Sequence, residues 1–436
     1  MHFDPLFAVY ALPLVALWMA WVLPGKIRSR RNQAILADNV QAGLAEPSSL
    51  HPVIDPARCL GCAACVQACP EKSVLGIIDG KATLIEPTMC VGHGACQTAC
   101  PTDAISLVFG TETRGVDIPL LSPRFETSVP GIFIAGELGG MGLIKNAIEQ
   151  GRQAIEAVAA RAKSTPGGEG VLDVLIVGCG PAGISASLGA MKQKLAFKTV
   201  DQNTLGGTVA HFPRGKLVMT APATLPLVGE VKFGEVSKEE LLGFWEKVLT
   251  DTGLKPSFEE QVVSITREHA HFTIVTSKGK YSAKSVLLAI GRRGTPRTLD
   301  VPGEELSKVV YRLIDAEQYA ERKVLVVGGG DSALEAAAQI AEQSNAKVTL
   351  SYRGNAYSRA RARNRDNVAA MVRHGIIDEV LNSTVTAVEP DAVTLNVGGE
   401  LRKIANDDVL VCAGGILPTQ FLRDIGIDVE TKFGTA

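Results

Sequence analysis

The chain begins with an apolar run, and its second half alternates short apolar segments with helical ones. Residues 5–25 contain no charged side chain, and about 20 helical residues span roughly 30 Å, the thickness of the hydrocarbon core of a bilayer. From Val171 onwards apolar strands alternate with helices, which predicts parallel sheets built of βαβ units. Residues 131–162 predict a further strand, a glycine turn and a helix from about Ile144 to Ala162.

The residues after the apolar run carry the charge that orients a membrane helix. They read KIRSRR at 26–31, whereas only His2, Asp4 and the amino terminus precede the run. The positive-inside rule therefore predicts a single-pass anchor in the inner (cytoplasmic) membrane, with the other domains facing the cytoplasm. A cleaved signal peptide is disfavoured, because positive charge before the run and a small-residue cleavage site after it are both missing. The alternative is an apolar helix that packs on the protein's own domains.

Charge and cysteine content narrow the function classes. Lys and Arg total 44 against 46 Asp and Glu, a formal net charge of −2, which excludes the basic footprint of nucleic-acid binding. Seven of the nine cysteines lie between Cys59 and Cys100. Such clustering favours a metal module over a distributed disulfide framework.

The clustered cysteines form two runs of equal spacing. The runs are Cys59-x2-Cys62-x2-Cys65-x3-Cys69-Pro70 and Cys90-x2-His93-x2-Cys96-x3-Cys100-Pro101. They resemble the bacterial ferredoxins that hold two 4Fe–4S clusters, in which the fourth cysteine of each run ligates the other cluster. A zinc ribbon is disfavoured because zinc needs only four ligands. Between the runs, Asp79-Gly80 flanked by apolar residues predicts a β-hairpin.

The ferredoxin resemblance implies a small α+β module and a ligand set for each cluster. Cluster I would take Cys59, Cys62, Cys65 and Cys100, and cluster II would take Cys69, Cys90 and Cys96. His93 stands where the family has a cysteine, and three possibilities stay open. His93 ligates iron, the cluster is of the 3Fe–4S type, or one iron takes an exogenous ligand.

Two glycine motifs follow apolar strands and open helices, as in dinucleotide-binding folds. The first is Gly178-x-Gly180-x-x-Gly183, and Asp201 ends the next strand, where an acid binds ribose hydroxyls. The second is Gly328-x-Gly330-x-x-Ala333, and the next strand ends in Tyr352 and Arg353. Glycine lets pyrophosphate approach a helix N-terminus. An arginine after the second strand favours the 2′-phosphate of NADPH. NADH is the alternative if the basic residues after this strand only face solvent and bind no phosphate.

From Val171 onwards the chain resembles the low-molecular-weight thioredoxin-reductase-like flavoproteins. The matching segments are GCGPAG, LGGT at 205–208, LLAIGRRGTP at 287–296, GGGDSA at 328–333 and VLVCAGGILPT at 409–419. The resemblance implies an α/β protein with two Rossmann-like domains and, by family habit, a possible homodimer. It implies FAD at Gly178, Gly180, Pro181, Ala182, Gly183, Asp201, Gly207 and Thr208, and NAD(P)H at Gly328, Gly330, Asp331, Ser332, Ala333, Tyr352, Arg353 and Arg359.

One segment that the family has near its C-terminus occurs here before the first glycine motif. TSVPGIFIAGE lies at 127–137, whereas the family has such a stretch near its C-terminus, so a circular permutation is predicted. Gly136 and Glu137 would then contact the ribityl and pyrophosphate of FAD, with glutamate replacing the usual aspartate. The predicted segments are 1–31 (membrane anchor with basic flank), 32–54 (linker), 55–108 (ferredoxin-like domain), 109–163 (permuted C-terminal part of the FAD domain), 164–170 (linker), 171–295 (first part of the FAD domain), 296–405 (NAD(P) domain) and 406–436 (return to the FAD domain).

Together these motifs predict a membrane-anchored NAD(P)H-dependent iron–sulfur flavoprotein. It would pass electrons between NAD(P)H, FAD and the clusters, to or from a one-electron partner: a ferredoxin, a cytochrome or a quinone-linked membrane complex. No catalytic side chain is assigned, because hydride transfer between cofactors needs no protein acid or base. The alternatives are a disulfide reductase and a membrane redox sensor or assembly subunit. The family's CxxC pair is missing before the second glycine motif, and Cys179 and Cys412 are predicted to be packing thiols.

Overall fold

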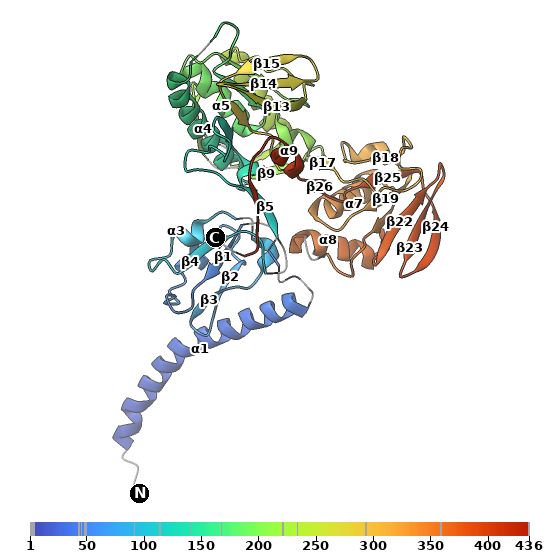
Figure 1. Ribbon diagram of the computed structural model, residues 1–436. Helices are drawn as coiled ribbons and strands as arrows, with labels where there is room; N and C mark the ends of the chain where they lie inside the picture. Colours follow the sequence, from blue (N-terminus) through green and yellow to red (C-terminus); the bar gives the residue numbers. More distant parts are fainter. Residues whose placement is uncertain are drawn as a thin grey trace. The chain divides into compact units, whose positions relative to one another are not determined.

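Two structural units make up the chain, which we describe from a computed structural model (Figure 1). The first unit comprises Met1–Gly115, Ala356–Ala362 and Phe433–Ala436, and the second comprises Val116–Asn355 and Arg363–Lys432. The structure describes residues 5–41, 44, 46–47, 50–90, 92–112, 115–140, 142–166, 168–219, 222–232, 234–292, 294–357 and 360–434.

The first unit combines one long helix with two small antiparallel sheets. Its elements are α1 (Pro5–Gln41), β1 (His51–Ile54), α2 (Ala64–Ala68), β2 (Leu75–Ile78), β3 (Lys81–Leu84), η1 (Pro87–Met89), α3 (Ala95–Thr98) and β4 (Ile105–Val108). Strand β1 pairs with β4, and β2 pairs with β3. Asp79 and Gly80 join β2 to β3 with positive φ angles of 48° and 75°, which suits a tight hairpin turn. The predicted hairpin is confirmed.

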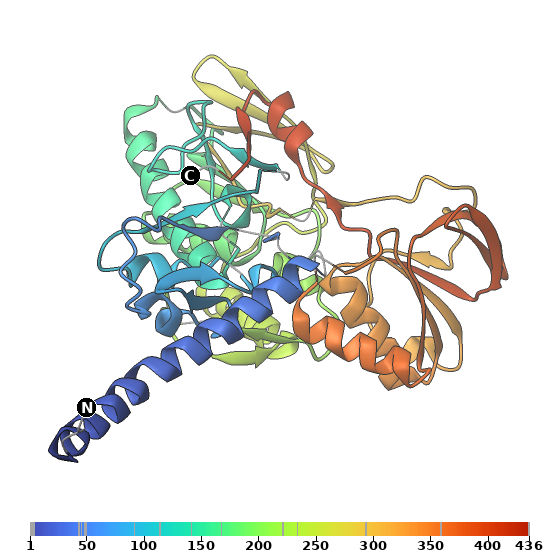
Figure 2. The ribbon, with the colours of Figure 1, turned by 90° about the horizontal axis from the view of Figure 1, so that it is seen from below.

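Helix α1 packs on this hairpin with its C-terminal half. The Asn32 amide donates to the Ile77 carbonyl at 3.0 Å, and Gln33 donates to the Asp79 carboxylate at 3.0 Å. The other half projects beyond the small sheets in both views (Figures 1 and 2). Within the described part of the chain, no helix is both long and apolar enough to cross a membrane. The predicted single-pass anchor and inner-membrane location are therefore wrong.

A four-stranded parallel sheet forms the first half of the second unit, in the order β6-β16-β7-β8. The strands are β6 (Ile132–Ile134), β16 (Val286–Leu288), β7 (Val174–Val177) and β8 (Phe197–Val200), and the helices beside them are α4 (Ile144–Ser164) and α5 (Pro181–Lys192). Both faces of the sheet are buried, so β6, β7 and β16 are apolar throughout, as buried parallel strands require. The edge strand β8 also carries Lys198 and Thr199. The predicted strand and helix within 131–162 are confirmed.

Helix α4 lies tightly against α5 because small residues line the contact. A Cβ atom at Gly151 would lie 2.2 Å from the Ala182 carbonyl oxygen, and one at Gly189 would lie 2.5 Å from the Ile155 side chain. Strand β5 (Val116–Pro119), which the proline-rich sequence did not suggest, pairs antiparallel with the last strand, β27 (Val429–Lys432). Residues upstream of Val171 thus complete the same domain as residues downstream of it.

The remaining elements of this half are small sheets, one helix and short turns. They are η2 (Glu137–Gly139), η3 (Gly207–His211), β9 (Leu217–Met219), β10 (Ala223–Leu225), β11 (Gly229–Val231), β12 (Glu235–Ser237), α6 (Lys238–Thr252), β13 (Val262–Glu268), β14 (His271–Thr276), β15 (Lys280–Ala283) and α9 (Thr419–Asp424). Helix α6 opens with a capping box of Ser237 and Glu240, which satisfies the backbone amides of these two residues.

A second parallel sheet forms the other half, in the order β18-β25-β19-β20-β21. Its elements are β18 (Val309–Val310), η4 (Ala316–Tyr319), β19 (Lys323–Val327), α7 (Asp331–Ser344), β20 (Lys347–Ser351), α8 (Ala362–Arg373), β21 (Ile377–Val380) and β25 (Asp408–Val411), with a meander of β22 (Ser383–Val388), β23 (Ala392–Val397) and β24 (Glu400–Ala405). Strands β17 (Thr295–Pro296) and β26 (Gly415–Ile416) pair where the chain crosses between the two halves.

Candidate cofactor sites

The first glycine loop lies at the C-terminal edge of the first sheet, between β7 and α5. Gly178 has φ 109°, and a Cβ atom there would lie 2.4 Å from the Ala289 carbonyl oxygen beyond β16. A Cβ atom at Gly183 would lie 1.8 Å from the Gly178 carbonyl oxygen. Only glycine therefore allows this turn, which presents the N-terminus of α5 and its residues Pro181 and Ala182.

Two other predicted FAD segments meet this loop. A Cβ atom at Gly207 would lie 3.0 Å from the Gly180 Cα atom, and one at Gly136 would lie 3.1 Å from the Ala182 Cβ atom. Thr208 belongs to the turn η3, and its hydroxyl oxygen would lie 3.8 Å from a Cβ atom at Gly291. The chain thus gathers residues 136–137, 178–183 and 206–208 at one sheet edge, where α/β folds bind nucleotides.

Asp201 follows β8 and is almost fully buried beside the same loop. Its carboxylate accepts hydrogen bonds from the backbone amides of Cys179 at 2.6 Å and Asn203 at 2.7 Å. Burial raises the pKa of Asp201, and these two hydrogen bonds oppose the rise. The carboxylate therefore links the end of β8 to the glycine loop.

Sequence reasoning missed one half-buried cation at this edge, Arg292. Its guanidinium donates to the Asp117 carbonyl on β5 at 3.3 Å. Burial raises the pKa of Glu137, while the charge of Arg292 and a hydrogen bond from its backbone oppose the rise. Arg292 lies inside the segment LLAIGRRGTP, which carries the family resemblance, but no spacing or motif in the sequence indicates a role for its charge.

The second glycine loop is built in the same way at the edge of the second sheet. Gly328 has φ 146°, and a Cβ atom there would lie 2.4 Å from the Cys412 carbonyl oxygen. A Cβ atom at Gly330 would meet nothing within 4 Å, so the N-terminus of α7 has room for a phosphate group. The helix begins with Asp331, Ser332 and the buried Ala333.

Of the described residues after β20 that are predicted to bind NAD(P)H, only Tyr352 is seen to lie against this loop. A Cβ atom at Gly329 would lie 2.4 Å from the Tyr352 ring, so Tyr352 lies against the glycine loop. Arg353 is exposed. Arg359 lies outside the described residues. The Asp331 carboxylate accepts a hydrogen bond from the Asn364 amide of α8 at 2.8 Å.

Two cavities in the first unit divide the predicted cluster ligands. One is lined by Cys69, Cys90, His93 and Cys96, and the other by Cys59, Cys62, Cys65 and Cys100. Each cavity therefore combines side chains of both runs, in the crossover that the ferredoxin resemblance implies. Among the described residues, no three such side chains converge as they would on a single metal ion.

The cysteines of both cavities sit in environments that suit bound iron. Burial raises the pKa of the Cys65, Cys69, Cys90 and Cys96 thiols, so the thiolate form needs a positive partner. Backbone amides stabilise two other sulfurs of these cavities: Ala104 donates to the Cys100 sulfur at 3.3 Å and Ala82 to the Cys59 sulfur at 3.4 Å. Hydrogen bonds to sulfur also adjust cluster potentials.

The two remaining cysteines differ from these. Cys179 is fully buried, and burial raises its pKa to about 12. A thiol with such a pKa is almost wholly protonated near pH 7 and is a poor nucleophile. Cys412, at the end of β25, is half-buried.

Comparison with known proteins assigns both parts of the chain. Residues 175–434 match the sequence profile of the family described as pyridine nucleotide-disulphide oxidoreductase, and residues 51–101 match that of the 4Fe-4S dicluster domain. The ferredoxin--NADP reductase of Ignicoccus hospitalis is 30% identical over 270 residues, which cover 60% of this chain and 83% of that protein. The bacilliredoxin reductase Bdr of Bacillus subtilis is 27% identical over 267 residues, covering 60% and 82%.

A solved structure agrees with these matches. The bacillithiol disulfide reductase Bdr of Staphylococcus aureus superposes with a TM-score of 0.53 at 28% identity, covering 58% of this chain and 80% of that one. The chain belongs to the pyridine nucleotide-disulphide oxidoreductase family, with a thioredoxin-reductase-like α/β fold of Rossmann-type domains. It is an NAD(P)H-dependent FAD and iron–sulfur oxidoreductase, and the prediction of an enzyme of this kind is confirmed.

Proposed function

We propose that this enzyme passes electrons between NADPH and a one-electron carrier protein of the ferredoxin type, through FAD and two iron–sulfur clusters. The observation that carries the proposal is that one chain holds two tight glycine loops, each between a parallel strand and a helix, and two cysteine-lined cavities. FAD would supply the step between two-electron hydride chemistry and one-electron transfer, and the clusters would carry single electrons.

The chain's own residues would bind and orient these groups. The amides at the N-terminus of α5 and the glycines at 178, 180 and 183 would hold the FAD pyrophosphate, with Asp201 at the ribose and Gly136, Glu137, Gly207 and Thr208 beyond it. The amides at the N-terminus of α7 would hold the NADPH pyrophosphate, with Tyr352, Arg353 and Arg359 at the adenosine end. The geometry of the two glycine loops supports the pyrophosphate assignments. Those of Arg353 and Arg359 rest on the sequence pattern alone.

The alternative function, disulfide reduction by the Cys179 thiol, is disfavoured by the surroundings of this residue. Relatives of this chain bear the names of disulfide reductases, but Cys179 is buried and its pKa is raised to about 12. Reduction of a partner's disulfide by the flavin would therefore have to proceed without the Cys179 thiol. The redox-sensor alternative has no feature of its own in the described residues.

Replacing a cysteine of one cavity tests whether electrons reach a carrier protein through the clusters. We would measure NADPH-dependent reduction of a bacterial ferredoxin by the wild type, Cys59→Ala and the control Cys412→Ala, which replaces a cysteine outside both cavities. The proposal predicts at least a tenfold loss of ferredoxin reduction in Cys59→Ala only, with NADPH oxidation by a small quinone retained. Equal ferredoxin reduction in all three proteins would refute it.

We also propose that His93 ligates iron in the second cluster. His93 lines the cavity with Cys69, Cys90 and Cys96, and imidazole in place of thiolate raises cluster potentials. His93→Cys should keep a four-iron cluster at a lower potential, whereas His93→Ala should lose iron from one cluster. An unchanged iron content and electron paramagnetic resonance spectrum in His93→Ala would favour an exogenous ligand.

We propose further that the flavin domain is circularly permuted. The proposal is supported by the pairing of β5 with β27, the place of β6 in the first sheet and the hydrogen bond from Gly434 N to the Phe109 carbonyl at 2.9 Å. A rearranged chain that begins at Val171 and carries residues 116–163 after Lys432 should bind FAD. Failure to fold would contradict the permutation. The segment boundaries and the homodimer stay predictions.

A further inference from the structure

We propose that Arg292 sets the reduction potential of the flavin, as the cation on the flavin side of the first nucleotide site. The inference rests on the proposed function, because it requires FAD at the edge of the first sheet. No motif assigned a role to this residue, and it stands out through its position in the fold.

The strand order defines the direction in which FAD would lie. Asp201 follows β8 and the glycine loop follows β7, so the path from adenosine ribose to pyrophosphate runs from β8 to β7. Continuing the same way leads to β16 and then β6, each about 4.8 Å further on. Arg292 lies four residues beyond β16, and Glu137 lies three residues beyond β6. Both therefore lie on the side of the pyrophosphate that is opposite the adenosine.

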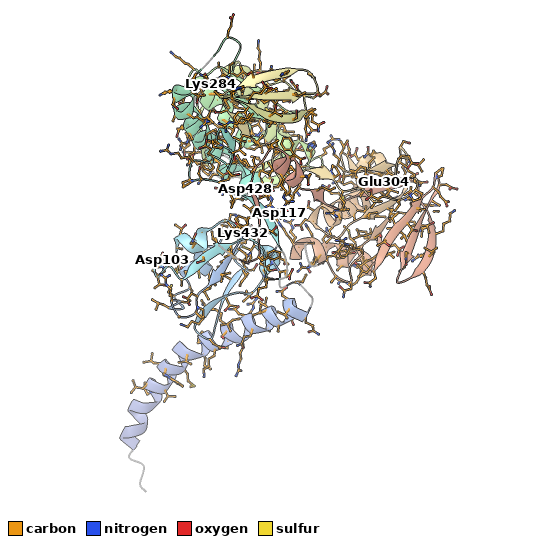
Figure 3. All side chains as sticks on the ribbon, viewed as in Figure 1. Asp103, Asp117, Lys284, Glu304, Asp428 and Lys432 are labelled. Atoms are coloured by element: carbon orange, nitrogen blue, oxygen red, sulfur yellow. The ribbon has the colours of Figure 1, made fainter. Side chains whose placement is uncertain are left out.

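Arg292 is held in place rather than extended into solvent. Its guanidinium donates to the Asp117 carbonyl at 3.3 Å, and the Asp117 carboxylate accepts a hydrogen bond from the Thr431 hydroxyl at 2.7 Å. Asp117 lies on β5 beside β27, where Figure 3 labels it near Lys432. The paired strands thus fix the guanidinium at the sheet edge.

The charge of Arg292 is not cancelled by a direct ion pair. Between described residues, no carboxylate oxygen lies within 4.0 Å of its guanidinium nitrogens. The carboxylates of Glu137 and Asp117 act on Arg292 through their charges, and desolvation is the largest cause of the pKa shifts of both Glu137 and Arg292. An arginine remains protonated in proteins, so the site keeps a partly buried positive charge.

A fixed cation favours the reduced flavin over the oxidised one. When a hydride from NADPH brings two electrons and one proton, NADP⁺ is released and the reduced flavin bears one negative charge more than the oxidised flavin. A half-buried guanidinium stabilises that added charge more strongly than water-exposed groups do. Arg292 would therefore raise the potential and help the flavin accept the hydride.

The test measures the flavin midpoint potential of the full-length holoenzyme. Wild type, Arg292→Gln, Arg292→Lys and the control Arg124→Gln, which removes an exposed arginine, are reduced against a reference dye at saturating FAD. We expect Arg292→Gln to shift the oxidised-to-reduced equilibrium at least tenfold toward oxidised flavin, which for two electrons is about 30 mV. Arg292→Lys should stay near wild type. Equal potentials in Arg292→Gln and Arg124→Gln would overturn the inference.

A second variant covers the case in which Arg292→Gln does not fold. Glu137→Gln removes the opposing negative charge, so at pH 8 its flavin potential must rise. A potential that is unchanged or lower would overturn the inference. If wild-type protein binds no FAD, the proposed function fails instead, whereas an FAD-loaded protein with unmoved potentials refutes only the role of Arg292.

Discussion

The Asp201 carboxylate accepts a hydrogen bond from the backbone amide of Cys179 at 2.6 Å, and so joins the end of β8 to the first glycine loop. Both residues are buried. The contact holds Asp201, proposed to bind ribose, against the glycine loop proposed to bind pyrophosphate.

Replacing Asp201 with alanine should therefore harm both stability and FAD binding. The change leaves the Cys179 amide buried without its acceptor, a loss of about 1–3 kcal/mol in the free energy of unfolding. We expect urea denaturation of Asp201→Ala to show this loss together with a lower FAD content. Asp391→Ala, at an exposed position, is the control and should match the wild type.

Cys179→Ala should keep full NADPH oxidation and carrier reduction. The thiol is fully buried and burial raises its pKa to about 12, so it takes no part in thiol chemistry near pH 7. We expect a loss of about 1 kcal/mol in the free energy of unfolding, as is common for a small buried side chain. A large drop in activity at unchanged FAD content would revive the disulfide-reductase alternative.

The stability of the FAD-free protein should depend on the ionisation of Glu137. Burial raises its pKa in the folded state, so the folded state binds more protons than the unfolded state above the ordinary glutamate pKa of about 4.3. Stability from this group is then present below that value and is lost as the pH rises through the folded-state pKa. In urea unfolding from pH 4 to 8, the stability of Glu137→Gln relative to wild type should first increase with pH and then level off above the folded-state pKa of Glu137. A constant difference across this range would contradict the prediction.

Lys216 and Glu335 should couple the two halves of the second unit. They form an ion pair across 119 residues of chain, and the Glu335 carboxylate also accepts from the Asn364 amide at 3.1 Å. A double-mutant cycle with Lys216→Ala and Glu335→Ala should give a coupling energy of about 0.5–1 kcal/mol, because both side chains are partly exposed. Additive effects on unfolding would show that the pair contributes nothing.

Arg353→Ser should move the nucleotide preference from NADPH toward NADH. A charge-assisted hydrogen bond contributes about 1.5–3 kcal/mol, so kcat/KM for NADPH should fall by roughly 10- to 100-fold. The value for NADH should change little. Steady-state kinetics with both nucleotides decide this, and an equal loss for both would contradict a role at the 2′-phosphate.

Local patterns predicted the parts of the fold that depend on neighbouring residues. The Asp79-Gly80 hairpin, helix α4 and the strand–loop–helix units at 174–192 and 323–344 follow from turn residues and periodicity. The length of α1 does not follow, because the polar and charged residues after Lys26 are typical of a basic flank and a linker. Its contacts through Asn32 and Gln33 are made with residues about 45 positions away.

The missed site residue depends on strand order, which the sequence does not carry. Arg292 and Glu137 meet because β6 lies next to β16 in the sheet, although 155 positions separate the two residues in sequence number. The partner of Arg292 is a backbone carbonyl on β5, a strand that the proline-rich sequence does not suggest. No local pattern predicts such a contact.

An anaerobic titration of the purified holoenzyme with NADPH tests the central claim most directly. Visible spectra would follow the flavin band and the broader iron–sulfur absorbance as reducing equivalents are added. The account predicts that the flavin band bleaches and that the iron–sulfur absorbance falls with it. A flavin band that does not bleach, or clusters that remain oxidised after both NADPH and a reduced ferredoxin are added, would contradict electron transfer between NADPH, FAD and the clusters.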